Sequence, residues 1–296
     1  MKVLIIGSGG FIGKNLLNHL ASQGVEVCGV SSSDSNGINP HTGLLSEQFS
    51  IPCGTDTIIY LAQSPYYRQV PERAPHLFNV NVTSAIQVAE LARQSQVKRF
   101  LYTSTGNVYA SSFHPLPEDA PLNRDNWYAL SKIQAEEALS LFRNDMEIII
   151  ARLFGIYGVG QTDKLVSKLI NSVLTEKTIR IDKNPIDPTD LGGLRLSLTY
   201  IQDFLDIVTQ ILDLEKIPQY LNISGSETIS IREIATLAGE LLVSKPKLDY
   251  IEQPRHGNLI ADNKKLLSLV DYQFTNFKQG LDKIINEQFC KTHDNS

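Results

Sequence analysis

The sequence Lys2-Val3-Leu4-Ile5-Ile6-Gly7-Ser8-Gly9-Gly10-Phe11-Ile12-Gly13 begins almost at the first residue of the chain. Its first part is an apolar run of strand length, and apolar residues with helical spacing follow the glycines. The order strand, glycine turn, helix suits a pyrophosphate, because glycines let the backbone approach the phosphates and the helix N-terminus directs N–H groups at the anion. We therefore predict a dinucleotide site, although the glycines could also serve a tight turn alone. Its expected contacts are Gly7, Gly10, Phe11, Ile12 and Gly13.

Strand-like and helix-like segments alternate from residue 2 to about residue 153. This alternation predicts an α/β fold with a Rossmann-like, doubly wound parallel sheet. Beyond Gly158 the segments become shorter and less regular, which indicates a smaller C-terminal, substrate-binding region. We expect a dinucleotide-binding domain over residues 1–158, a substrate-binding region over 159–290 from which some segments return to the first domain, and a polar tail over 291–296.

Three further residues form a candidate catalytic group. Four positions separate Tyr128 from Lys132, so a helix places both side chains on one face, one turn apart. An ammonium beside a phenol favours the phenolate, and we expect Lys132 to lower the pKa of Tyr128. Thr105 ends an apolar, β-branched run, which places its hydroxyl at the carboxyl end of a strand, where ligands of open α/β sheets bind.

The composition narrows the class of protein. The 296 residues contain 27 Lys and Arg against 32 Asp and Glu, and no basic block appears, which argues against a nucleic-acid partner. Neither a signal peptide nor a membrane span is visible. The cysteines Cys28, Cys53 and Cys290 lack metal-site spacing, so we expect no metal and a reducing, cytoplasmic location.

The spacing Gly7-x-x-Gly10-x-x-Gly13, taken with Thr105 and Tyr128-x-x-x-Lys132, resembles the extended short-chain dehydrogenases, the nucleotide-sugar epimerase and dehydratase family. The resemblance runs from Met1 to about Leu281. It implies NAD or NADP as cofactor, a nucleotide-diphosphate sugar as substrate, and a homodimer.

The same resemblance implies further cofactor contacts. The family's third strand end lies over the cofactor, and here it reads Leu61-Ala62-Gln63. Asn79 matches a cofactor-contacting position, although it could equally cap the start of a helix. Phe154, Tyr128 and Lys132 are also expected at the cofactor. At the end of the second strand, Ser31 stands where NAD-using relatives have an acid, so the choice between NAD and NADP stays open, and Asp34 could reach back to this position.

For the substrate, the resemblance implies that Arg255 binds the diphosphate, because a guanidinium can donate two parallel hydrogen bonds to phosphate oxygens. Arg195 is a second candidate, one place out of register with another arginine of the family. Gly155 stands where sugar epimerases often have an asparagine that holds the substrate, so the sugar is not identified.

These parts suit hydride transfer at a sugar carbon, with Tyr128 as acid and base and with Thr105 orienting the reacting oxygen. The resembling 4,6-dehydratases have an Asp-Glu pair after the catalytic threonine, whereas this chain has Gly106-Asn107. We therefore expect an epimerase or a 4-ketoreductase and not a 4,6-dehydratase. Two alternatives remain: a non-catalytic dinucleotide-binding sensor or scaffold, and a reductase of a non-sugar carbonyl, which would have no use for Arg255.

Overall fold

The computed structural model describes residues 1–290, and the expected polar tail at 291–296 lies outside the described residues. The chain divides into two compact units. Unit 1 consists of residues 1–110, 120–153 and 208–221, and unit 2 consists of residues 111–119, 154–207 and those from 222 onward. Among the described residues, no helix is long and apolar enough to span a membrane.

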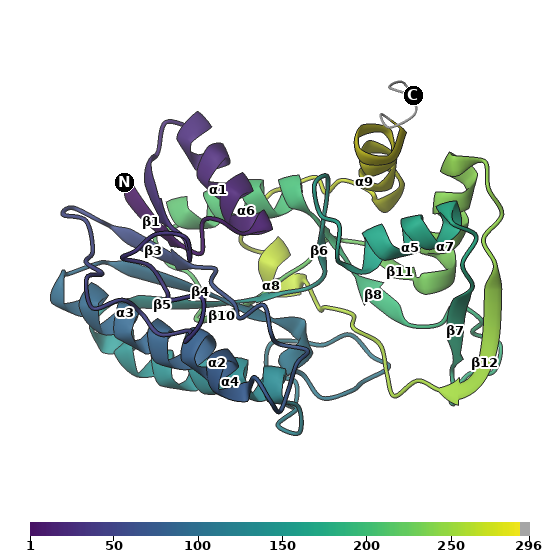
Figure 1. Ribbon diagram of the computed structural model, residues 1–296, viewed down its shortest axis with the longest axis horizontal. Helices are drawn as coiled ribbons and strands as arrows, with labels where there is room; N and C mark the ends of the chain where they lie inside the picture. The colour runs from purple at the N-terminus through teal and green to yellow at the C-terminus, as the bar shows by residue number, and fades with distance from the viewer. Residues whose placement is uncertain (291–296) are drawn as a thin grey trace. The chain divides into compact units, whose positions relative to one another are not determined.

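A six-stranded sheet is the centre of unit 1 (Figure 1). In spatial order its strands are β10 (Tyr220–Ile223), β5 (Glu147–Leu153), β4 (Arg99–Thr105), β3 (Thr57–Tyr60), β1 (Lys2–Ile6) and β2 (Glu26–Val30). From β2 to β5 every neighbouring pair is parallel. The chain moves outward in opposite directions from β1, so the order reverses between β1 and β3. The predicted Rossmann-like, doubly wound sheet is thereby confirmed.

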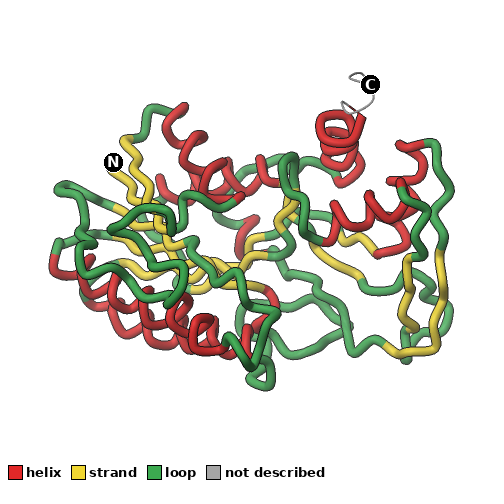
Figure 2. Tube along the Cα trace, in the orientation of Figure 1, coloured by secondary structure: helices red, strands yellow, loops and turns green. Residues whose placement is uncertain are grey.

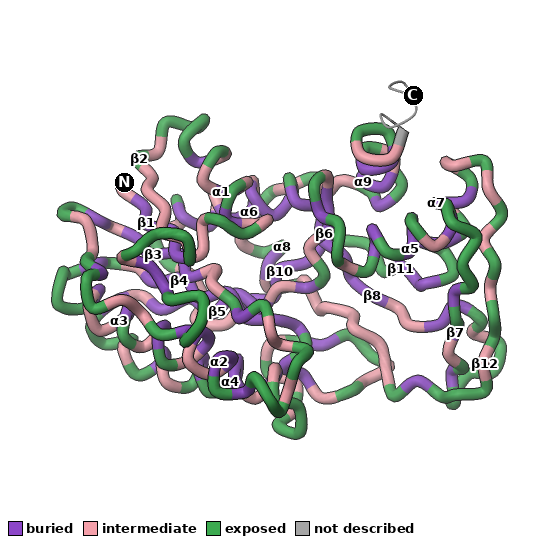
Figure 3. The backbone as a smooth tube through the Cα atoms, viewed as in Figure 1, coloured by how far each residue is buried: buried purple, intermediate pink, exposed green. Residues whose placement is uncertain are grey.

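Helices cover both faces of this sheet (Figures 1 and 2). One face carries α2 (Ala74–Phe78), α3 (Ser84–Gln94) and α4 (Trp127–Leu139), and the other carries α1 (Phe11–Ser22) and α6 (Ile201–Asp213). The central strands are buried almost throughout, as Figure 3 shows for β1, β3, β4 and β5. Their continuous apolar sequences follow from this burial on both faces.

A π-helical stretch, Asn79–Thr83, joins α2 to α3. Two buried tyrosines of the sheet donate hydrogen bonds to carbonyl oxygens in this stretch, Tyr60 to Val80 and Tyr102 to Asn81. A continuous helical segment therefore includes Asn79 and ends at Gln94. The alternative that Asn79 caps the start of a helix is wrong, because the helix begins at Ala74.

The segment between β2 and β3 contains no strand. It has only an isolated bridge between Ile38 and Leu45. The loop is held instead by Ile38 and Phe49, which are buried in the apolar cluster beneath the sheet. Apolar residues that anchor a loop in the core give a sequence pattern like that of a strand, but here they form no β-ladder.

Unit 2 contains three two-stranded sheets and its own helices. The strand pairs are β6 (Ile156–Tyr157) with β9 (Thr199–Tyr200), β7 (Ile179–Lys183) with β12 (Leu248–Pro254), and β8 (Arg195–Ser197) with β11 (Thr228–Ser230). The helices are α5 (Leu165–Leu174), α7 (Ile231–Leu242), α8 (Lys264–Leu267) and α9 (Phe277–Ile284). The smaller C-terminal sheets agree with the expected smaller region.

Two local features position the chain in unit 2. Ser230 caps α7, because its hydroxyl accepts from the Glu233 backbone N–H while the Glu233 carboxylate accepts from the Ser230 N–H. Gly155 has a φ of +38°, and a Cβ at this position would lie 2.3 Å from Cδ2 of Leu198. The positive φ favours a glycine at this position, and a larger residue would also have to displace the Leu198 side chain.

Candidate active site

The glycine turn between β1 and α1 fits a dinucleotide pyrophosphate. Gly7 has a φ of +92°, and a Cβ there would lie 2.7 Å from the backbone nitrogen of Ala62. A Cβ at Gly13 would lie 2.3 Å from the Gly7 carbonyl oxygen, so this glycine lets α1 pack on the turn. Gly10 caps α1 without a side chain, and a Cβ there would have its nearest neighbour at 3.5 Å. The N–H groups of Phe11 and Ile12 belong to the first turn of α1, where backbone N–H groups have no carbonyl partner within the helix.

A carboxylate stands at the end of β2 after all. Asp34 accepts hydrogen bonds from the Ser31 backbone N–H at 2.7 Å and from the Ser31 hydroxyl at 2.9 Å. These hydrogen bonds lower the pKa of Asp34, so the exposed side chain is an anion at neutral pH. The acid expected at the strand end is thus supplied from three residues further along, as the Ser-x-x-Asp spacing allows.

Asn126 begins α4 and thereby sets the positions of the two central candidates. Its side-chain oxygen accepts from the backbone N–H groups of Tyr128 at 3.0 Å and Ala129 at 3.1 Å, a helix cap that the sequence analysis missed. One turn further, Lys132 Nζ donates to the Thr103 carbonyl oxygen on β4 at 2.8 Å. The structure therefore brings Tyr128 and Lys132 to one side of α4, beside β4.

The hydroxyl of Tyr128 has two polar neighbours. It donates to the side-chain oxygen of Gln63 at 3.0 Å. Burial raises the pKa of Tyr128 above its usual value, and the polar side chain of Thr105 lowers this pKa by less. The expectation that Lys132 lowers this pKa is wrong for this structure. The Lys132 ammonium is turned to the Thr103 carbonyl and lies 4.6 Å from the centre of the Tyr102 ring.

Lys132 is 2% exposed, and its burial lowers its pKa from 10.5 to about 7. The carboxylate of Glu136, one helical turn away, acts in the opposite direction on this pKa. Among the described residues, the Thr103 carbonyl is the one hydrogen-bond partner of Nζ. An ammonium has three donors, so two of them remain for the hydroxyls of a ribose. This is a second feature of unit 1 that fits a bound dinucleotide.

A buried ion pair that the sequence analysis missed lies behind these residues. Glu136 binds Arg152 through two hydrogen bonds of 3.2 and 2.7 Å and also accepts from the Ser104 hydroxyl. The Arg152 guanidinium lies between the rings of Tyr109 and Tyr220, 4.9 Å from each ring centre. The pair ties α4 to β4 and β5. Its only signal in the sequence is a glutamate one turn after the lysine and an arginine inside an apolar strand.

The remaining expected cofactor residues occupy different places. Leu61, Ala62 and Gln63 follow β3 in unit 1, and the Leu61 N–H donates to the carbonyl of Ile6 on β1. The Asn79 side chain donates to the Thr42 carbonyl oxygen at 2.7 Å and so holds the loop between β2 and β3. Phe154 belongs to unit 2 and is fully buried. Cofactor contacts at these positions stay predictions.

Both arginines expected at the substrate lie in unit 2. The Arg255 side chain is 3% exposed, its Nη2 donates to the Asp190 carboxylate, and its Nε donates to the Asn258 side-chain oxygen at 3.2 Å. The guanidinium carbon lies 5.5 Å from the centre of the Phe113 ring. Arg255 Nη1 is buried and has no hydrogen-bond partner among the described residues. An unpartnered, buried cationic donor fits an anionic ligand.

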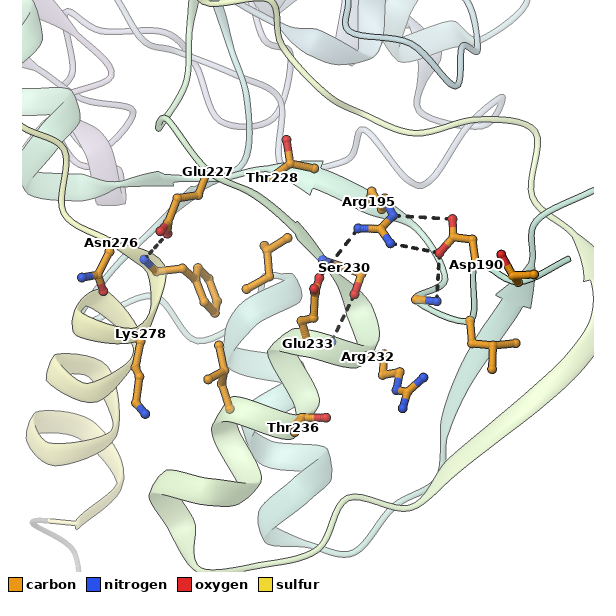
Figure 4. A pocket seen from close by; sticks show the side chains of 16 residues that line it. Asp190, Arg195, Glu227, Thr228, Ser230, Arg232, Glu233, Thr236, Asn276 and Lys278 are labelled. Carbon is orange, nitrogen blue, oxygen red and sulfur yellow. Dashed lines mark hydrogen bonds and ion pairs between the residues drawn. The ribbon is translucent and has the colours of Figure 1, made fainter. Parts of the chain in front are cut away.

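Arg195 is placed differently from Arg255. It donates to Asp190 through Nη2 at 3.1 Å and Nε at 3.5 Å, and its Nη1 lies 4.0 Å from Glu233. Figure 4 shows Arg195 beside a cavity of about 960 Å³. The residues lining this cavity all belong to unit 2, and the cavity includes Asp190 and Arg195 but not Arg255.

Comparison with known proteins identifies the relatives of the chain. The family model described as "NAD dependent epimerase/dehydratase family" matches residues 3–224. The chain is 26% identical to the "Uncharacterized UDP-glucose epimerase YtcB" of Bacillus subtilis, over 95% of this chain and 96% of the relative. It is also 26% identical to the GDP-6-deoxy-D-talose 4-dehydrogenase of Aggregatibacter actinomycetemcomitans, over 98% of this chain and 99% of the relative.

Solved structures show the same fold. The UDP-glucuronic acid 4-epimerase of Bacillus cereus, in complex with UDP-glucuronic acid and NAD, superposes with a TM-score of 0.78 at 23% identity, over 97% of this chain and 98% of that chain. The UDP-glucose 4-epimerase of Thermus thermophilus in complex with NAD gives a TM-score of 0.76 at 20% identity, over 97% and 98% of the two chains.

Proposed function

The chain belongs to the NAD dependent epimerase/dehydratase family, and from this premise we propose that it epimerises a nucleotide-diphosphate sugar or reduces a 4-keto sugar. The observation that carries the proposal is the group Thr105, Tyr128 and Lys132 in unit 1. Tyr128 and Lys132 stand one turn apart on α4, and the side chain of Thr105, at the carboxyl end of β4, acts on the pKa of the Tyr128 phenol. The relatives include both epimerases and a 4-dehydrogenase, which supports keeping both reactions.

The cofactor of the family is NAD, and the residues of unit 1 suit it. The turn at Gly7, Gly10 and Gly13 would hold the pyrophosphate, and Lys132 would hold the nicotinamide ribose. Asp34 would accept hydrogen bonds from the adenosine ribose hydroxyls. Its negative charge would repel the 2′-phosphate of NADP, so we propose that the chain prefers NAD.

A bound NAD would supply the chemistry of hydride transfer to and from a sugar carbon. As the sugar is oxidised, Tyr128 takes the proton of the reacting hydroxyl, and as a ketone is reduced, Tyr128 gives that proton back. Burial favours the protonated phenol, which is the form that donates a proton to a ketone oxygen. In the oxidation direction, Tyr128 would have to lose this proton before it could accept that of the sugar hydroxyl. The Thr105 hydroxyl would hydrogen-bond the same substrate oxygen and orient it.

The residues after Thr105 bear on the reaction type. Asn107 donates to the Thr105 hydroxyl oxygen from its backbone N–H at 3.2 Å and from its side chain at 3.0 Å. The pair Gly106-Asn107 offers neither the acid nor the base that elimination of water requires. We therefore propose that the chain does not act as a 4,6-dehydratase. In unit 2, the buried Nη1 of Arg255, which has no hydrogen-bond partner among the described residues, supports a diphosphate-bearing substrate.

The test is a reaction panel. The purified protein would be incubated with NAD, NADH, NADP or NADPH and with UDP-, GDP-, dTDP- and CDP-sugars and their 4-keto forms, while absorbance at 340 nm and product identity are followed together. A changed sugar without net change in reduced cofactor would identify an epimerase, and stoichiometric oxidation of NADH would identify a ketoreductase. Cofactor binding without turnover on any sugar would refute both and support the sensor. If the protein reduces a non-sugar carbonyl and the Arg255→Ala variant keeps this activity, the protein would be a reductase of non-sugar carbonyls.

A further inference from the structure

We propose that Asp190 and Arg195 are positioning residues that hold Arg255 in place for a nucleoside diphosphate, and that Arg195 does not bind the diphosphate itself. The inference rests on the proposed function, which supplies the ligand. It assigns to Asp190 a role that the sequence did not suggest. It also replaces the role of Arg195 expected from the resemblance.

The acceptor positions of Asp190 are filled from within unit 2. Oδ2 accepts from Arg255 Nη2, from Arg195 Nε and from the Asn184 side chain at 3.0 Å, and Oδ1 accepts from Arg195 Nη2 and the Gly192 N–H at 3.1 Å. Five hydrogen bonds meet the roughly four lone-pair positions of a carboxylate. Burial raises the pKa of Asp190, but these bonds lower it by more, so the group is an anion. It has no capacity left for a ligand, and its charge would repel a phosphate.

Arg195 is committed to carboxylates. Two of its three nitrogens donate to Asp190, and the third lies 4.0 Å from Glu233, which is itself held by the cap of α7 (Figure 4). A diphosphate that bound Arg195 would have to break a two-pronged ion pair. Such pairs are among the strongest hydrogen bonds in proteins and fix the orientation of both groups. We therefore assign Arg195 to the carboxylate of Asp190.

Of the two arginines, Arg255 is the one with a buried donor that has no partner among the described residues. Asp190 holds its Nη2 and Asn258 holds its Nε, so the plane of the guanidinium is fixed by two partners on different segments. The same Asn258 oxygen accepts from the Arg195 backbone N–H at 3.2 Å, which links the two arginines a second time. The buried Nη1 is then held in one direction without an acceptor among the described residues.

The test is calorimetric titration of the full-length protein, with saturating NAD, using UDP and inorganic diphosphate as probes. We expect Arg255→Lys to weaken UDP binding about tenfold or more, Asp190→Asn about five- to tenfold, and Arg195→Ala about threefold, because only the first loses the direct contact. Inorganic diphosphate should show the same order. The decisive comparison is Arg195→Ala in the Asp190→Asn background, where we expect no further loss of UDP affinity.

A matched control separates positioning from general damage. Asp203 is also buried in unit 2 and accepts from Thr275 and Tyr272, so Asp203→Asn should lower the melting temperature without changing UDP affinity. If Asp190→Asn does not fold, Arg195→Ala is measured in the Arg255→Lys background, where the same absence of further loss is expected. UDP binding that is lost in Asp190→Ala but largely kept in Asp190→Glu would also support the assignment.

Three results would overturn the inference. A further threefold loss from Arg195→Ala in either background would show that Arg195 contacts the diphosphate directly. Tighter binding by Asp190→Asn would show that Asp190 competes with the ligand. An equal loss in Asp203→Asn would show a merely structural effect. The proposed function fails separately, through absence of UDP binding to the wild type or through an Arg255→Lys variant that binds UDP as the wild type does.

Discussion

Replacing Lys132 by methionine is expected to make the protein more stable at neutral pH while removing its activity. The ammonium is 2% exposed, and its burial lowers its pKa to about 7. A methionine of similar length places no charge in this site. The gain in stability and the loss of turnover would together show that the charge is kept for function and not for folding.

The size of the effect follows from two opposing contributions. The fall of the pKa from 10.5 to about 7 corresponds to about 5 kcal/mol, at roughly 1.4 kcal/mol per unit, as an upper limit on the cost of burying the charge at pH 7. Methionine also loses the hydrogen bond to the Thr103 carbonyl, which contributes about 1.5–3 kcal/mol. We expect Lys132→Met to raise the free energy of unfolding by about 2 kcal/mol at pH 7, or the Tm by about 4–8 °C.

The lowered pKa of Lys132 determines how its contribution to stability changes with pH. Between about pH 7 and pH 10.5 the unfolded chain keeps the proton on Lys132 while the folded chain has lost it, so stability from this group rises with pH across that window. Below pH 7 both states are protonated and its contribution is constant. The advantage of Lys132→Met should therefore be largest at pH 6–7 and shrink toward pH 9.5. Urea unfolding of both proteins at four pH values measures the difference, in which all other titrating groups cancel.

The control is Lys168→Met, at an exposed position of α5, which should change stability by less than about 0.5 kcal/mol at every pH. A Lys132→Met protein that is less stable than the wild type at pH 7 would refute the reasoning, as would a difference that does not vary with pH. Retained turnover in the variant would refute the catalytic placement of Lys132.

Four further changes test other parts of the structure. Tyr128→Phe should lower kcat at least 100-fold while the Kd for NAD changes less than about threefold in fluorescence titration, because it removes only the proton donor. Asp34→Asn should reduce the preference for NAD over NADP about tenfold in cofactor kinetics, because the charge facing a 2′-phosphate is lost. Glu136→Gln should lower the free energy of unfolding by about 3–5 kcal/mol in urea, because it leaves Arg152 buried beside a neutral partner. Gly155→Ala should lower it by about 1–3 kcal/mol, because its φ is +38° and a Cβ would meet a neighbouring leucine.

Matched variants give these predictions their contrast. Glu137→Gln removes an exposed carboxylate from the same helix and should cost less than about 1 kcal/mol. Gly54→Ala adds a Cβ at a φ of +76° with no atom within 4 Å, and should cost about 1 kcal/mol from the backbone alone. Equal losses of stability in the two glutamate variants would contradict the role given to burial, and equal losses in the two glycine variants would contradict the role given to packing. An unchanged cofactor preference in Asp34→Asn would remove Asp34 from the ribose site, and full activity of Tyr128→Phe would remove Tyr128 from catalysis.

The parts of the fold that depend on local patterns could be predicted from the sequence. The apolar runs at Lys2–Ile6 and Arg99–Thr105 form strands, and the glycine turn leads into α1, because period and turn chemistry act over a few residues. The spacing of Tyr128 and Lys132 placed both on one helix for the same reason.

What the sequence did not disclose depends on contacts between distant segments. The ammonium of Lys132 donates its hydrogen bond to the Thr103 carbonyl, which is 29 residues away in the chain. Arg255 is held by Asp190, 65 residues away in an irregular loop whose sequence has no regular period. Asp34 lies only three residues from its partner Ser31, but the run of serines before it did not show which residue its carboxylate would contact.

The division of the chain into alternating segments has a consequence for its synthesis. Unit 1 needs residues 208–221, which leave the ribosome after residues 154–207 of unit 2, and these residues supply the carbonyls of Leu212 and Leu214 that accept from Arg99. A nascent chain that ends near residue 158 therefore exposes the edge of β5 without β10 and leaves Arg99 without these two acceptors. Such an edge can pair with other chains. The earliest point at which unit 1 can close is after residue 221, so folding is coupled to translation of about three quarters of the protein, and a ribosome-stalling series should show protease resistance only past that length.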